Sequence, residues 1–255
     1  MSTSPPIAYP AFELCGVAIH AISRLQIQQW ILSKANSKCP ATAMYVNAHA
    51  INLAQSDDAF RTALRQADIV FCDGFGVRLG AKLLGYPLPE RFTLPDWIED
   101  LARLFAQNQY SMFFLGGRPG VAEQAKCKLE HLVPNLQIEA QHGYFESDET
   151  EAIVARINAA RPQLLLVGMG MPMQELWVQA NAHLLTAHVI ITVGALFDYM
   201  AGAVPRGPRW LTDHGLEWLS RLWFEPKRLW RRYILGNPQF VWLVAKQWIR
   251  QKSAR

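Results

Sequence analysis

The stretch LLLVGMGMPMQELW, residues 164–177, decides the fold class of this chain. It opens with consecutive apolar residues, passes through a glycine-rich turn and enters a segment that is expected to be helical over residues 174–185. Continuous apolar runs are typical of strands buried on both faces, as in parallel sheets, and a helix after such a strand is typical of α/β folds. Residues 164–177 therefore predict one strand–turn–helix step of a layered α/β protein.

The same step recurs on both sides of this stretch. Strands with their turns are expected within residues 12–22, 41–47, 68–76, 110–120, 136–145 and 187–202, and helices within residues 22–35, 50–67, 77–85, 96–107, 121–133 and 148–160. This alternation predicts a Rossmann-like α/β fold, a mostly parallel sheet with helices on both faces. Ligands of such sheets bind beyond the carboxyl ends of the strands, so we expect the loops after the strands to converge on one site.

The last part of the chain has a different pattern. After about residue 205 we expect only amphipathic helices, interrupted at Pro226 and at residues 236–238. Residues 206–255 hold 11 lysines and arginines against 3 acidic residues, a net charge of +8 in a chain of net charge +4, and six of the nine tryptophans. We therefore divide the chain into an α/β domain, residues 1–205, and a helical, basic, tryptophan-rich appendage, residues 206–255, with a role of its own at the site.

Composition excludes several classes of protein. The 255 residues are 51% hydrophobic and 18% charged, which allows a large core and argues against disorder. The cysteines form no CxxC pair, which indicates neither a zinc site nor a disulfide framework and favours a reducing cytosol; they are Cys15, Cys39, Cys72 and Cys127. The opening MSTSPPIAYP is not a signal peptide, and no stretch reaches the roughly 20 apolar residues that span a bilayer. We expect a cytoplasmic protein that lies on a membrane if it meets one.

The segment CDGFG places Asp73 at the end of a buried strand, directly before Gly74. The carboxylate could cap the following helix, or it could accept a proton from an attacking hydroxyl group. Because no DxD pair is present and a Mg²⁺ site usually has more than one hard oxygen ligand, we expect no metal site here.

Two glycine-rich loops follow other expected strands. LGGRPG, with Gly116 and Gly117, precedes a helix whose first N–H groups suit a phosphate, but it lacks the full dinucleotide fingerprint, so a plain tight turn is an equal alternative. VGMGMPMQE, with Gly168, puts Gln174 and Glu175 at a helix start. An amide there can bind a sugar hydroxyl or a base edge, and a glutamate there can serve the helix dipole alone.

The segment EWLSRLWFEPKRLWRRY, residues 217–233, mixes tryptophan with arginine. Arg221, Arg228 and Arg231 lie seven and three residues apart, close to one helical face if the proline between them only kinks the chain. Their planar forks suit phosphate oxygens, whereas tryptophan favours surfaces that are apolar on one side and wet on the other. Residues 240–252 are consistent with an amphipathic helix in a lipid headgroup layer. A phosphate clamp and a membrane-facing surface are therefore weighed against a solvated basic face.

In order along the chain, seven segments resemble the WecG/TagA/CpsF family of bacterial glycosyltransferases over about residues 12 to 240: VNAHAINLA, ADIVFCDGFGV, FFLGGRPGVAE, HGYF, LLLVGMGMPMQELW, VGALFDYMAGAVPRGPRWL and GLEWLSRLWFEPKRLWRRY followed by NPQF. The resemblance implies an inverting hexosyltransferase, similar to N-acetylmannosaminyltransferases, that moves a sugar from a UDP-sugar to a polyprenyl-diphosphate-linked saccharide. It implies no metal and no other cofactor, and a place on the inner face of the cytoplasmic membrane.

The resemblance also implies roles for individual residues. Asp73 matches the family's proposed general base, Asn47 an active-site asparagine and Gln174 the glutamine of a PxQE loop, while Arg221, Arg228 and Arg231 match appendage arginines that fold over the site and bind phosphates. The expected substrate-binding residues are Tyr45, Gly74, Gly116, Gly117, Gly168, Gln174, Glu175 and Arg206. Tyr45 stands where the family often has threonine, which indicates a different donor sugar or subgroup.

Two other classes of protein share parts of this pattern. A nucleic-acid-binding protein would also have clustered basic and aromatic residues, but the glycine loops and Asp73 would then have no role, so we expect no nucleic acid as a partner. A dinucleotide-dependent oxidoreductase would also have a doubly wound sheet, but the incomplete fingerprint counts against it. The transferred sugar, the acceptor saccharide and the oligomeric state, a homo-oligomer included, stay open.

Overall fold

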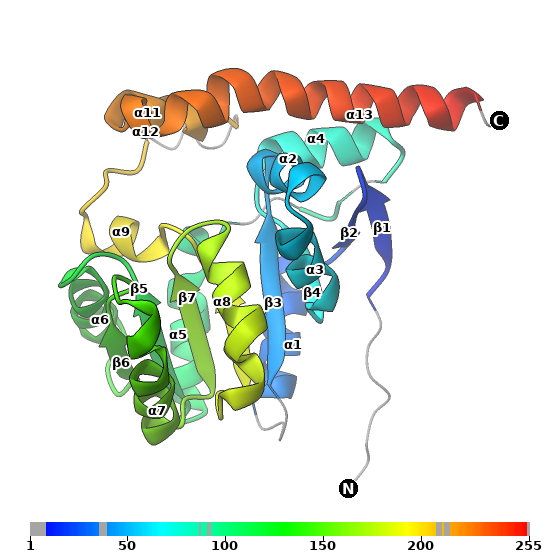
Figure 1. Cartoon of the computed structure of the whole chain (residues 1–255). Coiled ribbons are helices and arrows are strands. Elements are labelled where there is room, and N and C mark those ends of the chain that lie inside the picture. Colours follow the sequence, from blue (N-terminus) through cyan, green and yellow to red (C-terminus); the bar gives the residue numbers. More distant parts are fainter. Residues whose placement is uncertain are drawn as a thin grey trace, which may run out of the picture.

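A six-stranded parallel sheet forms the centre of the molecule (Figure 1). The computed structural model describes residues 9–35, 40–86, 88–90, 93–207, 211 and 215–253. The strands lie in the order β4-β3-β8-β7-β5-β6, with all hydrogen-bonded neighbours parallel. Their bounds are β3 (Ala41–Val46), β4 (Ile69–Cys72), β5 (Ser111–Gly116), β6 (Gln137–Gln141), β7 (Leu164–Gly168) and β8 (Val189–Thr192). The predicted α/β fold is confirmed.

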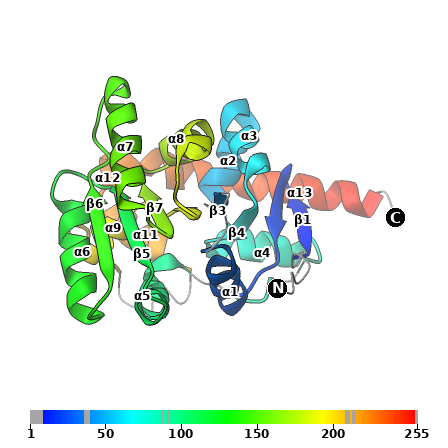
Figure 2. The same cartoon turned by 90° about the horizontal axis from the view of Figure 1, so that it is seen from below.

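Helices cover both faces of this sheet, as the view from below shows (Figure 2). One face carries α1 (Arg24–Lys34), α5 (Ile98–Gln107), α6 (Val121–Leu132) and α9 (Leu196–Ala201), and the other carries α3 (Asp58–Gln66), α7 (Thr150–Ala160) and α8 (Met173–Asn181). Alternate residues of β3 enter the two cores: Ala43 and Tyr45 join the first, Met44 and Val46 the second. This burial on both faces is the reason that the strand is a continuous apolar run.

Residues 12–22, expected as one strand, form a separate antiparallel hairpin of β1 (Ala11–Leu14) and β2 (Val17–His20). Cys15 and Gly16 make the turn with φ angles of 50° and 81°. Positive φ at both positions is the geometry of a type I′ hairpin turn, which matches the twist of the two strands. The expectation of a single strand was wrong because Cys-Gly is not one of the usual hairpin dipeptides.

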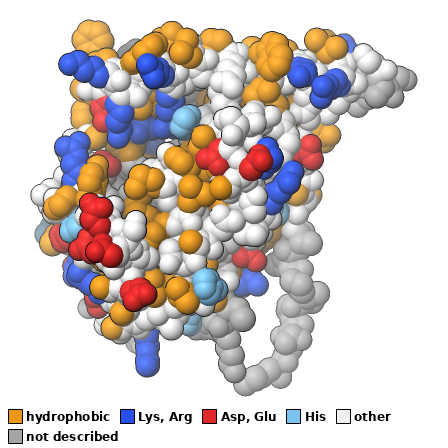
Figure 3. All heavy atoms as spheres, viewed as in Figure 1, with side chains coloured by type: hydrophobic (Ala, Val, Ile, Leu, Met, Phe, Trp, Pro, Cys, Tyr) orange, Lys and Arg blue, Asp and Glu red, His pale blue; other side chains and the backbone are white. Residues whose placement is uncertain are grey.

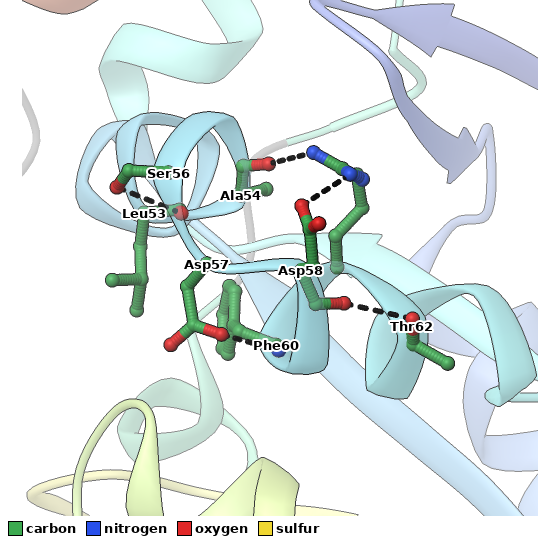
Figure 4. Close-up of polar contacts among 8 residues, drawn as sticks. Leu53, Ala54, Ser56, Asp57, Asp58, Phe60 and Thr62 are labelled. Atoms are coloured by element: carbon green, nitrogen blue, oxygen red, sulfur yellow. Dashed lines mark hydrogen bonds and ion pairs between the residues drawn. The ribbon is translucent and has the colours of Figure 1, made fainter.

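The single helix expected over residues 50–67 is two helices, α2 (Ala48–Ser56) and α3, with Asp57 between them. Asp57 has extended backbone geometry and its carboxylate accepts a hydrogen bond from the Phe60 N–H at 2.9 Å, which caps α3 (Figure 4). Arg61 ties the two helices together because its guanidinium donates to the Ala54 carbonyl at 3.0 Å. The corner turns α2 toward the carboxyl edge of the sheet while α3 covers one face (Figure 1).

The C-terminal segment is helical where it is described, as expected. It comprises α11 (Glu217–Phe224), α12 (Pro226–Trp230), the π-helical turn η4 (Arg231–Leu235) and α13 (Gly236–Ser253). Pro226 starts α12, where its missing N–H needs no partner. The interruption expected at residues 236–238 was wrong, because Pro238 falls in the first turn of α13 and proline is tolerated there.

Helix α13 lies across the carboxyl edge of the sheet, over α2 and α4 (Phe75–Leu83) (Figure 1). Phe240 and Val244 are only 5% and 4% exposed and belong to the same hydrophobic core as α2 and α4. A Cβ atom built on Gly80 of α4 would lie 3.1 Å from Val244 Cγ2, so the two helices are in close contact. The change at residue 205 is thus a change of secondary structure within a shared core, and the division into an α/β domain and an appendage stays a prediction.

Two expectations about membranes and thiols bear on the described residues. Within the described ranges, each helix falls short of the length or the apolarity needed to cross a bilayer. Cys15, Cys72 and Cys127 are free thiols. Cys39 and Trp210 lie outside the described residues.

Candidate active site

Two adjoining cavities open at the carboxyl edge of the sheet, under the C-terminal helices. The first has a volume of about 440 Å³ and lies among the ends of β3 and β4, α4 and α13. The second has a volume of about 910 Å³ and lies among the loops after β5, β7 and β8, α12 and η4. The residues that line both cavities are Tyr45, His49, Ala195, Arg221 and Arg232. This is the edge at which open α/β sheets bind their ligands.

Asp73 and Asn47 lie together in the first cavity, as predicted. Pairing of β3 with β4 extends to Asp73, whose N–H donates to the Val46 carbonyl at 2.9 Å. Gly74 follows with φ of 158°, and a Cβ atom built on it would lie 3.3 Å from Asn47 Cβ. The glycine therefore allows the two polar residues to lie side by side. Asn47 also caps α2, since its Oδ1 accepts from the Ala50 N–H at 3.1 Å.

The appendage supplies arginine side chains to both cavities. Arg221 lines the first cavity with Asp73 and also the second, and its guanidinium carbon lies 5.7 Å from the centre of the Tyr199 ring, within the range of a cation–π contact. Arg228 and Arg231 line only the second cavity. Arg228 is paired with Glu225 at 2.5 Å. The structure thus brings Arg221 to the same cavity as Asp73 and places the other two predicted arginines in the adjoining second cavity.

Sequence reasoning missed Arg232, which lines both cavities beside Arg221. Its Nε atom is buried and has no hydrogen-bond partner among the described residues. Arg232 lies in η4, where a π turn holds more residues than an α turn. The predicted spacing of Arg221, Arg228 and Arg231 assumes one continuous helix. Glu225, between α11 and α12, has non-helical backbone angles instead. The spacing selected Arg231, which is exposed.

His49 was also missed. Burial, and then the positive charge of Arg232, lowers the pKa of His49 to about 4. The imidazole is therefore neutral near pH 7 and presents a hydrogen-bond donor and an acceptor to both cavities. Little in the sequence indicates that His49 belongs to the site, because a histidine in the first turn of a helix forms no distinctive pattern.

Gln174 and Glu175 lie beneath the cavities instead of lining them. Both side chains are 0% exposed. Gln174 Nε2 donates to Glu175 Oε1 at 2.7 Å. Gln174 Oε1 accepts from the Gly194 N–H at 3.0 Å. Gly194 in turn abuts the Tyr45 hydroxyl, since a Cβ atom built there would lie 2.4 Å from Tyr45 Oη. In this structure the pair supports the loop after β8, where Gly194 lines the second cavity, and the neighbouring Tyr45 lines both cavities.

Burial raises the pKa of Glu175 to about 7, although the hydrogen bond from Gln174 favours the charged form. Burial, followed by the negative charges of Glu175 and Asp73, also raises the pKa of the Tyr45 hydroxyl. Tyr45 therefore stays protonated at neutral pH and can donate a hydrogen bond into either cavity.

The predicted glycines divide into two groups. Gly74 lines the first cavity, and Gly117 and Gly168 line the second. Gly116 lines neither: its φ is 152° and a Cβ atom there would lie 2.3 Å from the Gly168 carbonyl oxygen. Gly116 is thus required for close contact between the ends of β5 and β7.

Arg206 also lines neither cavity. It forms an ion pair with Asp96 at 2.7 Å and donates to Thr93 Oγ1 at 3.1 Å. Thr93 itself lines the first cavity. The structure therefore does not bring Arg206 to the cavities as predicted, but uses it to hold the segment of η1 (Leu94–Asp96) that forms part of their wall.

The charges of the second cavity suit an anionic ligand. Five arginines line it, against three acidic residues, Glu146, Asp198 and Glu225; the arginines are Arg118, Arg221, Arg228, Arg231 and Arg232. Guanidinium groups bind phosphate oxygens with two parallel hydrogen bonds. In the part of the chain that the structure describes, no three histidine, cysteine or acidic side chains gather in a way that could hold a metal ion.

Comparison with known proteins shows the family of this chain. Residues 12–254 match the model of the glycosyl transferase WecG/TagA/CpsF family. Two curated relatives, from Staphylococcus aureus strains MRSA252 and NCTC 8325 / PS 47, are each 29% identical over 209 residues, which is 82% of this chain and 81% of the relative. Both are N-acetylglucosaminyldiphosphoundecaprenol N-acetyl-beta-D-mannosaminyltransferases.

Proposed function

Because the chain belongs to the WecG/TagA/CpsF family of glycosyl transferases, we propose that it moves a sugar from a UDP-sugar to a saccharide linked to polyprenyl diphosphate, with inversion at the anomeric carbon. The single observation that carries this proposal is that Asp73 and Arg221 line one cavity, which adjoins a second cavity rich in arginine. The names of the Staphylococcus aureus relatives support the class of acceptor.

The donor is placed in the larger, second cavity. Its diphosphate would lie against the arginines there, with the Gly117–Arg118 loop and the start of α6 beside it. Arg221 and Arg232 reach both cavities and would lie next to the bond that breaks. Preorganised cations at the position where charge develops lower the barrier to reaction, and we propose that these arginines do so in place of a metal ion.

The acceptor is placed in the first cavity. Its attacking hydroxyl would donate to the Asp73 carboxylate, which takes the proton as the oxygen attacks the anomeric carbon. The C1–O bond to UDP breaks as the new C1–O bond forms on the opposite face of the sugar ring, which inverts the anomeric centre. Asn47 in the first cavity and the Tyr45 hydroxyl at the boundary of the two cavities are available to orient the sugars.

A peripheral position on the inner face of the cytoplasmic membrane is part of the proposal. Exposed apolar side chains gather on the C-terminal helices, among them Trp223 at 83%, Trp242 at 58% and Ile249 at 57% exposed. Figure 3 shows such side chains interleaved with lysine and arginine along the top of the molecule. Apolar and cationic groups on one helical surface favour the headgroup layer of anionic bilayers.

The test is transfer itself. A panel of UDP-sugars is incubated with a synthetic lipid-diphosphate saccharide, in the presence of EDTA, and products are identified by mass spectrometry, with the anomeric configuration read by NMR. Asp73→Asn should retain UDP binding and lose transfer, while Asp148→Asn, an exposed carboxylate remote in sequence, serves as the matched control. Normal turnover by Asp73→Asn would remove it as the base, and binding of NAD(P) that UDP cannot displace would favour an oxidoreductase.

A further inference from the structure

The first cavity continues from Asp73 into an apolar groove between two helices, here called the α4–α13 groove. Its walls are Phe75, Leu79 and Leu83 from α4 and Phe240, Val241 and Val244 from α13. Donation of a proton by an acceptor hydroxyl requires only the polar part of the cavity, so the mechanism above leaves this groove without a role.

The groove is apolar and accessible at its outer part. Leu79 is 57%, Leu83 55% and Val241 64% exposed, whereas Phe240 and Val244 are buried at its base. Exposed leucine and valine side chains on facing helices are costly to leave in water, and a contiguous apolar surface of this kind marks a binding site. Arg78 and Lys82 are exposed on α4 next to Leu79 and Leu83, so cations flank the opening.

The two parts of the cavity differ in chemistry. Asp73, Arg221 and Arg232 are among the polar residues that line the cavity, whereas the walls contributed by α4 and α13 are largely apolar. A ligand that fits both parts must have a polar, anionic head joined to a hydrocarbon chain. Free sugars and nucleotides lack the chain, and a membrane phospholipid lacks the hydroxyl-bearing saccharide that Asp73 needs.

We propose that the α4–α13 groove binds the first isoprene units of the acceptor's polyprenyl chain. This inference rests on the proposed function, because it assigns a subsite for the lipid part of that acceptor. The groove is continuous with the cavity that holds Asp73, so a bound chain would align the saccharide hydroxyl with the carboxylate and leave the rest of the lipid free to enter the bilayer. The groove thus recognises the lipid directly, independently of any contact between protein and membrane.

The experiment compares two soluble acceptors in detergent-free solution without vesicles, so that membrane docking plays no part. Both carry the same saccharide diphosphate; one ends in a farnesyl chain and the other in a methyl group. The wild-type protein should show a KM lower by about tenfold or more for the farnesyl acceptor, since each methylene group buried in the groove favours binding. Leu79→Asp, and independently Val241→Asp on the opposite wall, should reduce the ratio of the two KM values toward one.

The control is Leu132→Asp on α6, where Leu132 is 51% exposed and lines neither cavity. It should keep the wild-type ratio and confirm that an exposed leucine tolerates the charge. Equal KM values for the two acceptors in the wild-type protein, or a ratio unchanged in both groove variants, would overturn the groove while transfer itself persists. Loss of an oligomer in Leu79→Asp without a change of the ratio would also overturn it, in favour of a second copy on this surface. Failure of every UDP-sugar with both acceptors would instead refute the proposed function.

Discussion

Replacement of Glu175 by glutamine should change how the stability of the protein depends on pH. Glu175 is 0% exposed and its Oε1 accepts from Gln174 Nε2 at 2.7 Å, whereas its Oε2 is buried without a hydrogen-bond partner among the described residues. Burial raises its pKa from 4.5 to about 7. Glutamine has nearly the same shape and keeps an oxygen for Gln174, but it does not titrate, and its buried amide N–H groups add a cost that does not change with pH.

The sign and size follow from linkage between protonation and folding. A carboxyl group whose pKa is raised in the folded state stabilises the protein fully below the unfolded pKa, and this stability is lost as pH rises through the folded pKa. The two pKa values of 4.5 and about 7 differ by about 2.5 units, which corresponds to about 3 kcal/mol. Relative to the wild type, the free energy of unfolding of Glu175→Gln should therefore rise by about 2 kcal/mol between pH 5 and pH 8.

Urea unfolding between pH 5 and pH 8 measures this difference. Other titrating groups, such as His20 and His49, contribute equally to both proteins and cancel when the two curves are subtracted. Glu139→Gln, at an exposed position on β6, is the matched control. Its free energy of unfolding should depend on pH in the same way as that of the wild type. A difference between Glu175→Gln and the wild type that stays constant from pH 5 to pH 8 would refute the assignment of a buried, partly protonated acid beneath the site.

Three further predictions concern the arginines, the loop after β8 and the membrane surface. Arg232→Ala should lower kcat/KM for transfer by about 100-fold or more, while Arg231→Ala, in the exposed position, should lower it less; equal losses in steady-state assays would show that the π turn does not select between them. Gln174→Leu should lower the free energy of unfolding by about 1–3 kcal/mol, because it leaves the buried Gly194 N–H without its acceptor, and urea unfolding that matches the wild type would contradict this. Trp223→Ala should weaken co-sedimentation with vesicles that contain anionic phospholipid, and unchanged binding would place the contact with lipid elsewhere.

The parallel sheet and the position of its binding edge could be predicted from the sequence. Each strand is buried on both faces, so its apolar run stands out against the helices without any knowledge of neighbours. Asp73 and Asn47 follow two such runs, and the carboxyl ends of parallel strands share one edge. Their meeting in one cavity therefore needed only the strand boundaries.

Local turns and helix joints were less predictable. The Cys15–Gly16 turn and the corner at Asp57 each depend on backbone angles of one or two residues, and their sequences also fit a continuous strand or helix. The same limit applies to η4, because a π turn has no distinct sequence pattern, and within it Arg232 lines both cavities whereas Arg231 lines only the second.

Burial of polar residues was decided by tertiary structure alone. Gln174 and Glu175 lie in the first turn of α8, directly after a glycine-rich loop, where the sequence pattern alone does not predict burial. Packing of α8 under the loop after β8 encloses both side chains, and Gln174 accepts a hydrogen bond from the Gly194 N–H. In the same way, Arg206 forms an ion pair with Asp96, which is far away in the sequence, and does not line the cavities. Sequence by itself determined which residues lie at the ends of strands, because that depends on local apolar patterns; which of them face a ligand depended on contacts between distant segments, which form only when the whole chain has packed.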